Sequence, residues 1–208
     1  MFFLRRPDRE AIDRFRAASS SLPLSYGPIG LARDRGNASN RDPDLIRGFD
    51  EDDTVAIVGR GQLDFARASA ALRGWKQFEI GWAELFRPPD AGITTGTVVV
   101  LLVHHLGFWS LNAARIVYEI DGPDRFGFGY GTLPNHSELG EETFEVWLDR
   151  ETGQVMYRIH AMSRPRAPLA RLGYPVARAL QARFRRDSVA AMRRAVASNA
   201  GKVDDVKP

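Results

Sequence analysis

The chain contains no cysteine among its 208 residues. Disulfide bonds, thiolate metal sites and cysteine nucleophiles are therefore excluded. It also lacks a long apolar run, since the longest, residues 98–103, is far shorter than the roughly 20 residues that a membrane-spanning helix needs. The apolar start, residues 1–4, ends at Arg5, so we expect no signal peptide. These absences predict a soluble, cytoplasmic protein.

Lysine is almost missing, because only Lys76, Lys202 and Lys207 are lysines and every other strong base is arginine. Codon bias of a GC-rich genome explains this preference, and a dedicated anion-binding surface is the alternative. The arginines are densest along one face of the last predicted helix: Arg178, Arg183, Arg185, Arg186, Arg193 and Arg194. No aromatic or small polar residues interleave with them to read bases, so a solvated helix face is expected and nucleic acid is not.

Helical spacing and strand alternation divide the chain clearly. Residues 9–19 and 63–75 have apolar positions at helical spacing, and 25–53 are irregular and rich in Gly, Asn, Asp and Pro. A strand is predicted at 54–58, and period-two segments predict six more at 77–86, 96–104, 112–120, 125–131, 142–149 and 154–163. A last helix is predicted at 168–197, interrupted at 173–175 by Gly173-Tyr174-Pro175.

Strands that follow one another, rather than alternating with helices, indicate the α+β class. We expect a curved antiparallel sheet of six to seven strands that grips a long C-terminal helix and encloses a cavity. Residues 1–50 would form an N-terminal helical and irregular extension, 51–198 the domain and 199–208 a flexible tail.

The segment 126–131 alternates aromatic residues with glycines, FGFGYG. A strand there would carry three aromatics on one face and three glycines on the other. A bare glycine face indicates strong curvature, or a helix or ligand pressed against the backbone. The spacing is not that of a dinucleotide-binding loop, which requires GxGxxG between a strand and a helix.

Several longer segments resemble one known family: YGPIG at 26–30, GRGQLDFARASAALRGWKQFEIG at 59–81, NAARIV at 112–117, GFGYGTLPNHSELGEE at 127–142 and SRPRAPLARLGYPVARALQ at 163–181. On these the chain resembles the family known as domain of unknown function 1990 (DUF1990) or UPF0548. The resemblance implies a helix-grip domain related to START and Bet v 1 proteins, which bind hydrophobic ligands, and it implies no established reaction. One departure is Ala114, where a cysteine is expected in many relatives.

The loop 132–138 and the acids after it are the candidate catalytic group. His136 could act as a general base with Glu138 or Glu142 orienting it, and Glu141 is a further candidate acid. The alternative is a hairpin loop whose polar groups cap its own backbone. The spacing matches no metal site, and we expect neither a metal nor a cofactor.

The candidate ligand-binding residues come from the strands. Arg115 and Arg164 lie in apolar surroundings, where an arginine either pairs with an acid such as Glu119, Glu142 or Glu145 or holds a ligand carboxylate or phosphate. Further candidates for the cavity wall are Trp82, Tyr130, Thr132 and Tyr157, although such aromatics are most often core.

The three histidines outside this loop have structural interpretations. His104 and His105 are neighbours on one strand and point to opposite faces, so at most one reaches the cavity. His160 is expected to be a satisfied sheet histidine.

Two functions follow from these residues. The preferred one is binding of a hydrophobic or amphipathic small molecule, and the alternative is an enzyme that uses His136 with a nearby Glu. A protein-interaction module that uses the segment around Tyr26 and the arginine-rich last helix is a third.

Overall fold

The structure is a computed structural model, which describes residues 1–33, 43–165 and 174–198. Its elements are, in chain order, β1 (Phe2–Phe3), α1 (Arg9–Ser19), α2 (Pro43–Ile46), β2 (Asp50–Arg60), α3 (Gly61–Arg73), the 3-10 helix η2 (Lys76–Phe78), β3 (Ala83–Phe86), β4 (Val98–His105), β5 (Phe108–Gly122), β6 (Arg125–Thr132), β7 (Glu138–Leu148), β8 (Gln154–Pro165) and α4 (Tyr174–Ser198).

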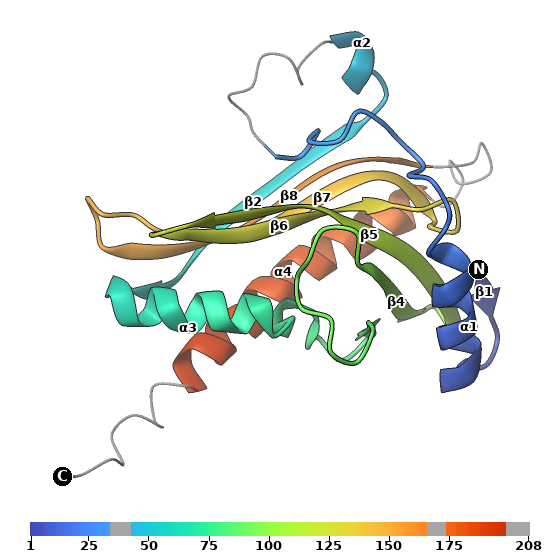
Figure 1. Ribbon diagram of the computed structural model, residues 1–208, viewed down its shortest axis with the longest axis horizontal. Helices are drawn as coiled ribbons and strands as arrows, with labels where there is room; N and C mark the ends of the chain where they lie inside the picture. The colour runs from blue at the N-terminus through green and yellow to red at the C-terminus, as the bar shows by residue number, and fades with distance from the viewer. Residues whose placement is uncertain (34–42, 166–173, 199–208) are drawn as a thin grey trace.

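The strands form one antiparallel sheet in the order β2-β8-β7-β6-β5-β4-β3, with β1 added beside β5. The sheet curves, and α3 and the long α4 lie against its concave face (Figure 1). This is the helix-grip arrangement, and it confirms the predicted fold class.

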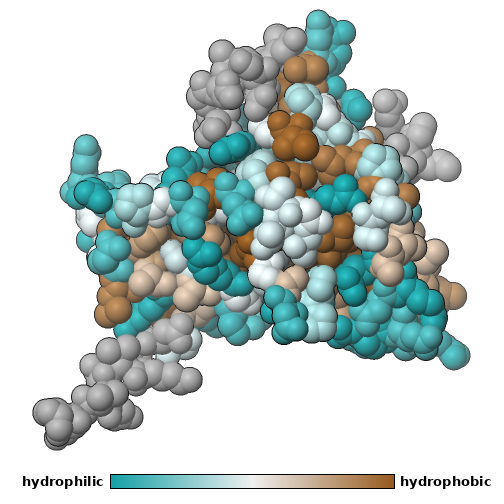
Figure 2. Space-filling model, viewed as in Figure 1, coloured by the Kyte–Doolittle hydropathy of each residue, from teal (hydrophilic) through white to brown (hydrophobic). Residues whose placement is uncertain are grey.

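The main core lies between the concave face and the two helices. It contains Phe128, Tyr130 and Phe144 from the sheet, Leu72 from α3 and Met192 from α4. These side chains follow the predicted alternation, because the aromatics of 126–131 all point inward. A second cluster packs Ile12 of α1 against β4 and β5 on the opposite face. The outer side of α1 is hydrophilic (Figure 2).

The glycine face of β6 is covered by the chain's own tyrosines, not by a helix or a ligand. A Cβ added at Gly129 would overlap the ring of Tyr118, and one at Gly131 would overlap the ring of Tyr26. Tyr118 comes from the neighbouring strand and Tyr26 from the N-terminal segment. The glycines therefore allow two aromatic rings to lie directly on the convex face.

One predicted strand is wrong over most of its length. Within 77–86, only Ala83–Phe86 is extended, and Lys76–Phe78 forms the 3-10 helix. Trp75 adopts a left-handed conformation (φ 60°) after α3, which turns the chain back. Phe78 is thereby buried between Phe144 and Phe184, and this tertiary packing outweighs the local alternation.

The other strands are present, and all of them except β4 are longer than predicted. β2 begins at Asp50, inside the segment that was predicted to be irregular, and β7 begins at Glu138 rather than at 142. The first part of the predicted last helix, 168–173, lies outside the described residues, as does the tail 199–208. From Tyr174 to Ser198 the helix is continuous.

Candidate ligand-binding cavity

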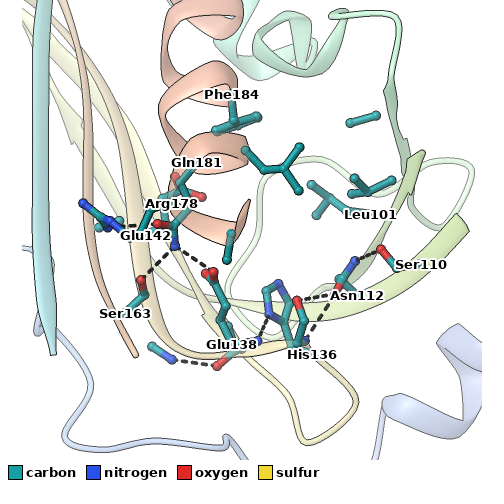
Figure 3. Close-up of a pocket in the computed structure, with 18 of the residues that line it drawn as sticks. Leu101, Ser110, Asn112, His136, Glu138, Glu142, Ser163, Arg178, Gln181 and Phe184 are labelled. Atoms are coloured by element: carbon teal, nitrogen blue, oxygen red, sulfur yellow. Dashed lines mark hydrogen bonds between the residues drawn. The ribbon is translucent and has the colours of Figure 1, made fainter. Parts of the chain in front are cut away.

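A cavity of about 470 Å³ lies between the concave face of the sheet and α4 (Figure 3). Leu101 and Val103 reach it from alternate positions of β4, and Leu180 and Phe184 reach it from successive turns of α4. Trp82 and Ala161 complete an apolar wall. The alternation of β4 and the helical repeat of α4 thus place an apolar stripe of the strand opposite an apolar stripe of the helix.

Tyr130 and Glu142 form the innermost polar pair of the cavity. They lie directly opposite each other on β6 and β7, and the Tyr130 hydroxyl donates to Glu142 Oε2 at 2.6 Å. Burial raises the pKa of Tyr130 well above 10, so the phenol keeps its proton and remains a donor. Glu142 therefore faces the cavity as an acid with a neutral hydrogen-bond partner.

Glu138 enters the cavity from the start of β7 and meets α4. Gln181 Nε2 donates to Glu138 Oε1 at 2.7 Å, and Gln181 Oε1 accepts from Arg178 at 2.9 Å. Arg178 in turn pairs with Asp52 of β2, which also binds Arg185 at 3.1 Å. A series of hydrogen bonds and ion pairs thus joins α4 to β7 and β2. Figure 3 shows its part around Gln181 and Glu138.

The cavity raises the pKa of both carboxyls. Removal from bulk water raises the pKa of Glu142 to about 7, and the negative charge of Glu138 adds to the rise. The hydrogen bond from Tyr130 and the charge of Arg185 act in the opposite direction. Burial likewise raises the pKa of Glu138 above its ordinary value. Near neutral pH the Glu142 carboxyl can therefore either donate or accept a proton.

His136 lies on the cavity wall opposite α4 (Figure 3). Its Nδ1 accepts from the backbone N–H of Glu138 at 3.1 Å, which places the proton of the neutral ring on Nε2. The backbone of Glu138, and not its carboxylate, therefore orients the ring. Asn112 supports the same loop by accepting from the Ser137 hydroxyl at 3.0 Å.

Three further predicted residues also line the cavity. Thr132 Oγ1 accepts from the N–H of Gly140 at 2.9 Å. Trp82 donates its indole N–H to Asp187 at 3.0 Å. Arg164 is exposed at the cavity, and its guanidinium lies 4.7 Å from the ring centre of Phe49.

Two predicted ligand-binding residues lie elsewhere, and the candidate acid Glu141 borders the cavity with its carboxylate turned away from it. Arg115 donates to the backbone carbonyls of Ser20 and Leu22, so it binds the segment after α1 and none of the acids considered for it. Tyr157 is fully buried in the core, where its hydroxyl meets Ser188 at 2.9 Å. The Glu141 carboxylate accepts from Tyr26, Gly30, Ala32 and Tyr118 on the convex face.

Of the remaining histidines, the neighbours His104 and His105 point to opposite faces of β4, as strand alternation requires. His105 lines the cavity, where Nε2 lies 3.4 Å from Ser110 Oγ, and His104 stacks on Trp109. His160 is buried, with Nδ1 2.8 Å from the carbonyl of Ala32 and Nε2 3.0 Å from Glu51.

Sequence reasoning missed Gln181, Asn112 and Asp52, and it assigned Arg178 and Arg185 to a solvated helix face. These two arginines face the sheet and Asp52. The available signal was their position beside the stripe Val176-Leu180-Phe184, which places them at the edge of the buried helix face.

No group of three or more His, Asp or Glu side chains that could hold a metal occurs in 1–33, 43–165 or 174–198. Within the same residues, no helix is long and apolar enough to cross a membrane.

The family described as "Domain of unknown function (DUF1990)" matches residues 32–191. The chain belongs to the DUF1990 family. This confirms the predicted family. A UPF0548 protein of Dictyostelium discoideum is 33% identical over 96% of this chain and 97% of its own length. A UPF0548 protein of Deinococcus radiodurans is 37% identical over 88% of this chain and 92% of its own.

Solved structures share the fold of this DUF1990 chain at low identity. TTHA0849 from Thermus thermophilus has a TM-score of 0.53 at 14% identity and covers 72% of this chain and 99% of its own. The di-domain ARO/CYC StfQ from the steffimycin biosynthetic pathway has a TM-score of 0.54 at 11% identity, over 79% of this chain and 56% of its own.

Proposed function

We propose that this DUF1990 protein binds a hydrophobic or amphipathic small molecule between the concave sheet and α4. The observation that carries the proposal is the cavity of about 470 Å³, in which an apolar wall is combined with hydrogen-bonded polar and charged groups. Small-molecule sites typically have roughly 300–1,000 Å³ and this same mixture of an apolar lining with a few oriented polar groups. The name of StfQ, an ARO/CYC from a biosynthetic pathway, is compatible with small-molecule chemistry in this fold.

Native mass spectrometry of the gently purified protein, followed by denaturing extraction, tests the proposal. We expect a bound small molecule that is released on denaturation. The variant Ala161→Phe should lose it, because Ala161 lines the cavity beside Glu142 and a ring there fills the space. Ala179→Phe is the matched control, since Ala179 is exposed on α4 and does not line the cavity.

A molecule that stays bound equally to both variants would show that binding occurs elsewhere. An apo protein that also fails to bind any compound of a hydrophobic and amphipathic panel in the wild type would contradict the proposal.

Acid–base catalysis in the same cavity is a second candidate function. The observation that favours it is the pKa of Glu142, raised to about 7 by burial, together with His136 on the wall of the same cavity. A carboxyl with a pKa near neutral and an imidazole in the same cavity can exchange protons with a bound substrate. Incubation of the extracted molecule with wild type, Glu142→Gln and His136→Asn tests it, and conversion by the wild type alone is the expected result. Equal conversion by all three would eliminate these two residues as catalysts.

A further inference from the structure

We infer that the cavity selects a ligand whose polar end is an amine or another hydrogen-bond donor, and not a carboxylate or a phosphate. This inference rests on the proposed function and concerns the chemistry of the same cavity.

Two of the three arginines of the cavity are already paired with an acid. Arg178 makes two hydrogen bonds to Asp52, and Arg185 lies 3.1 Å from the same carboxylate. Arg164 lies over the ring of Phe49. An arginine whose guanidinium is held by a carboxylate offers a ligand anion fewer free donors than an unpaired arginine.

The two carboxyls at the polar end are in the opposite situation. Glu142 has Tyr130 as its hydrogen-bond donor and Glu138 has Gln181, and both donors are neutral. Neither carboxyl makes an ion pair with any residue within 1–33, 43–165 and 174–198. Each also has one oxygen that receives no hydrogen bond from these residues, Oε1 of Glu142 and Oε2 of Glu138.

These free acceptors determine which ligand group is favourable. A carboxylate in a site of low polarity is costly without a cation or a hydrogen-bond donor, and a ligand ammonium supplies both. A ligand carboxylate would instead place a third negative charge beside Glu138 and Glu142, which opposes ionisation of all three groups.

The charged and titratable groups of the cavity together favour a cation. They come from β2, β4, β6, the loop before β7, β7, β8 and α4, and comprise Asp50, Asp52, His105, Tyr130, His136, Glu138, Glu141, Glu142, Arg164, Arg178 and Arg185. Because Glu142 ionises at a pKa of about 7, an ammonium ligand should bind more tightly at pH 8 than at pH 6.

A matched series of octyl compounds tests the inference by isothermal titration calorimetry at pH 8. Octylamine, octan-1-ol and octanoate share one chain and differ only in the polar group. We expect octylamine to bind at least about tenfold more tightly than octanoate, with octanol between them, since tenfold is a modest effect for one charge in a partly buried site. Glu142→Gln and Glu138→Gln should each reduce the preference for the amine.

Glu151→Gln, an identical change in the exposed turn between β7 and β8, is the control and should leave the preference unchanged. Octanoate that binds as tightly as octylamine, or more tightly, would overturn the inference while the cavity-binding proposal stands. An amine preference that persists in both cavity variants would also overturn it. Failure of all three compounds to bind the wild type would overturn both proposals.

Discussion

Glu142 is a carboxylic acid on the face of β7 that also carries Phe144 and Val146. Phe144 and Val146, the next two residues on the same face, are fully buried in the core. Glu142 is less completely buried than these two residues, and its carboxyl meets Tyr130 and the cavity. A charged group at such a position lowers the stability of the fold unless it is protonated or paired, which is typical of residues kept for function.

The position of Glu142 predicts how stability depends on pH. Its folded pKa, about 7, is above the ordinary 4.5, so the native state binds this proton more tightly than the unfolded chain does. The free energy of unfolding should therefore fall as the pH rises from 4.5 to 7, by roughly 3 kcal/mol from this group alone. Urea unfolding of the wild type and Glu142→Gln from pH 4.5 to 8 measures this contribution.

We expect a flatter pH profile for Glu142→Gln, because the amide that replaces the carboxyl cannot ionise, whereas Glu151→Gln should keep the slope of the wild type. Parallel profiles for all three proteins would show that Glu142 ionises with an ordinary pKa.

The β4–β5 hairpin is the element that ends at the rim of the cavity. His105 pairs with Phe108, so the turn contains only Leu106 and Gly107, and both have positive φ, 50° and 79°. Asn-Gly suits such a turn, and a leucine there is strained. Leu106 is also 72% exposed, and both it and Phe2, which is 63% exposed on the adjoining β1, line the cavity.

Replacement of this leucine should stabilise the hairpin. Leu106→Asn places a residue that tolerates the left-handed conformation in the turn, and we expect the free energy of unfolding to rise by about 1 kcal/mol. Chemical denaturation measures the change. Leu4→Asn, at a leucine that is 79% exposed and lacks a positive φ, should stay within about 0.5 kcal/mol of the wild type. A stability loss in Leu106→Asn would mean that the contacts of the leucine side chain stabilise the fold by more free energy than its left-handed backbone conformation costs.

At the scale of the whole molecule, the N-terminal segment is part of the sheet's convex layer. The Glu141 carboxylate, 1% exposed, accepts hydrogen bonds from the backbone of Gly30 and Ala32 and from two tyrosine hydroxyls. The arrangement leaves room for those tyrosines only because β6 has glycines beneath them. Glu141 thus joins residues 26–32 to the strand whose other face forms the cavity.

Loss of the Glu141 charge should release this segment. Glu141→Gln replaces one acceptor oxygen with an NH₂ that faces N–H and O–H donors, and we expect a loss of roughly 2–4 kcal/mol in the free energy of unfolding. Hydrogen exchange should also become faster at Gly30 and Ala32, whose N–H groups bind this carboxylate. Glu151→Gln, at the exposed acid of the β7–β8 turn, is the control and should change stability by less than about 0.5 kcal/mol. Unchanged exchange in Glu141→Gln would show that the segment is held by its apolar contacts alone.

The sequence by itself determined the α+β class, the long helix at the C-terminal end and most of the strands, because period-two and helical spacings record which residues share a face. It also drew attention to the polar loop and acids of His136, Glu138 and Glu142, which line the cavity and whose catalytic role stays a prediction. The strand predicted at 77–86 failed because burial of Phe78 is decided by residues far away in the chain.

Only the tertiary structure decided which shared face became the cavity. Alternation places Arg115 and Tyr130 on opposite faces of their strands, but it does not say which face is concave. The pairing of Arg178 with Asp52 and of Gln181 with Glu138 joins α4 to β2 and β7 and follows from where the helix lies across the sheet. The cavity is the space that the curved sheet and this helix leave between them, so no local pattern could encode it.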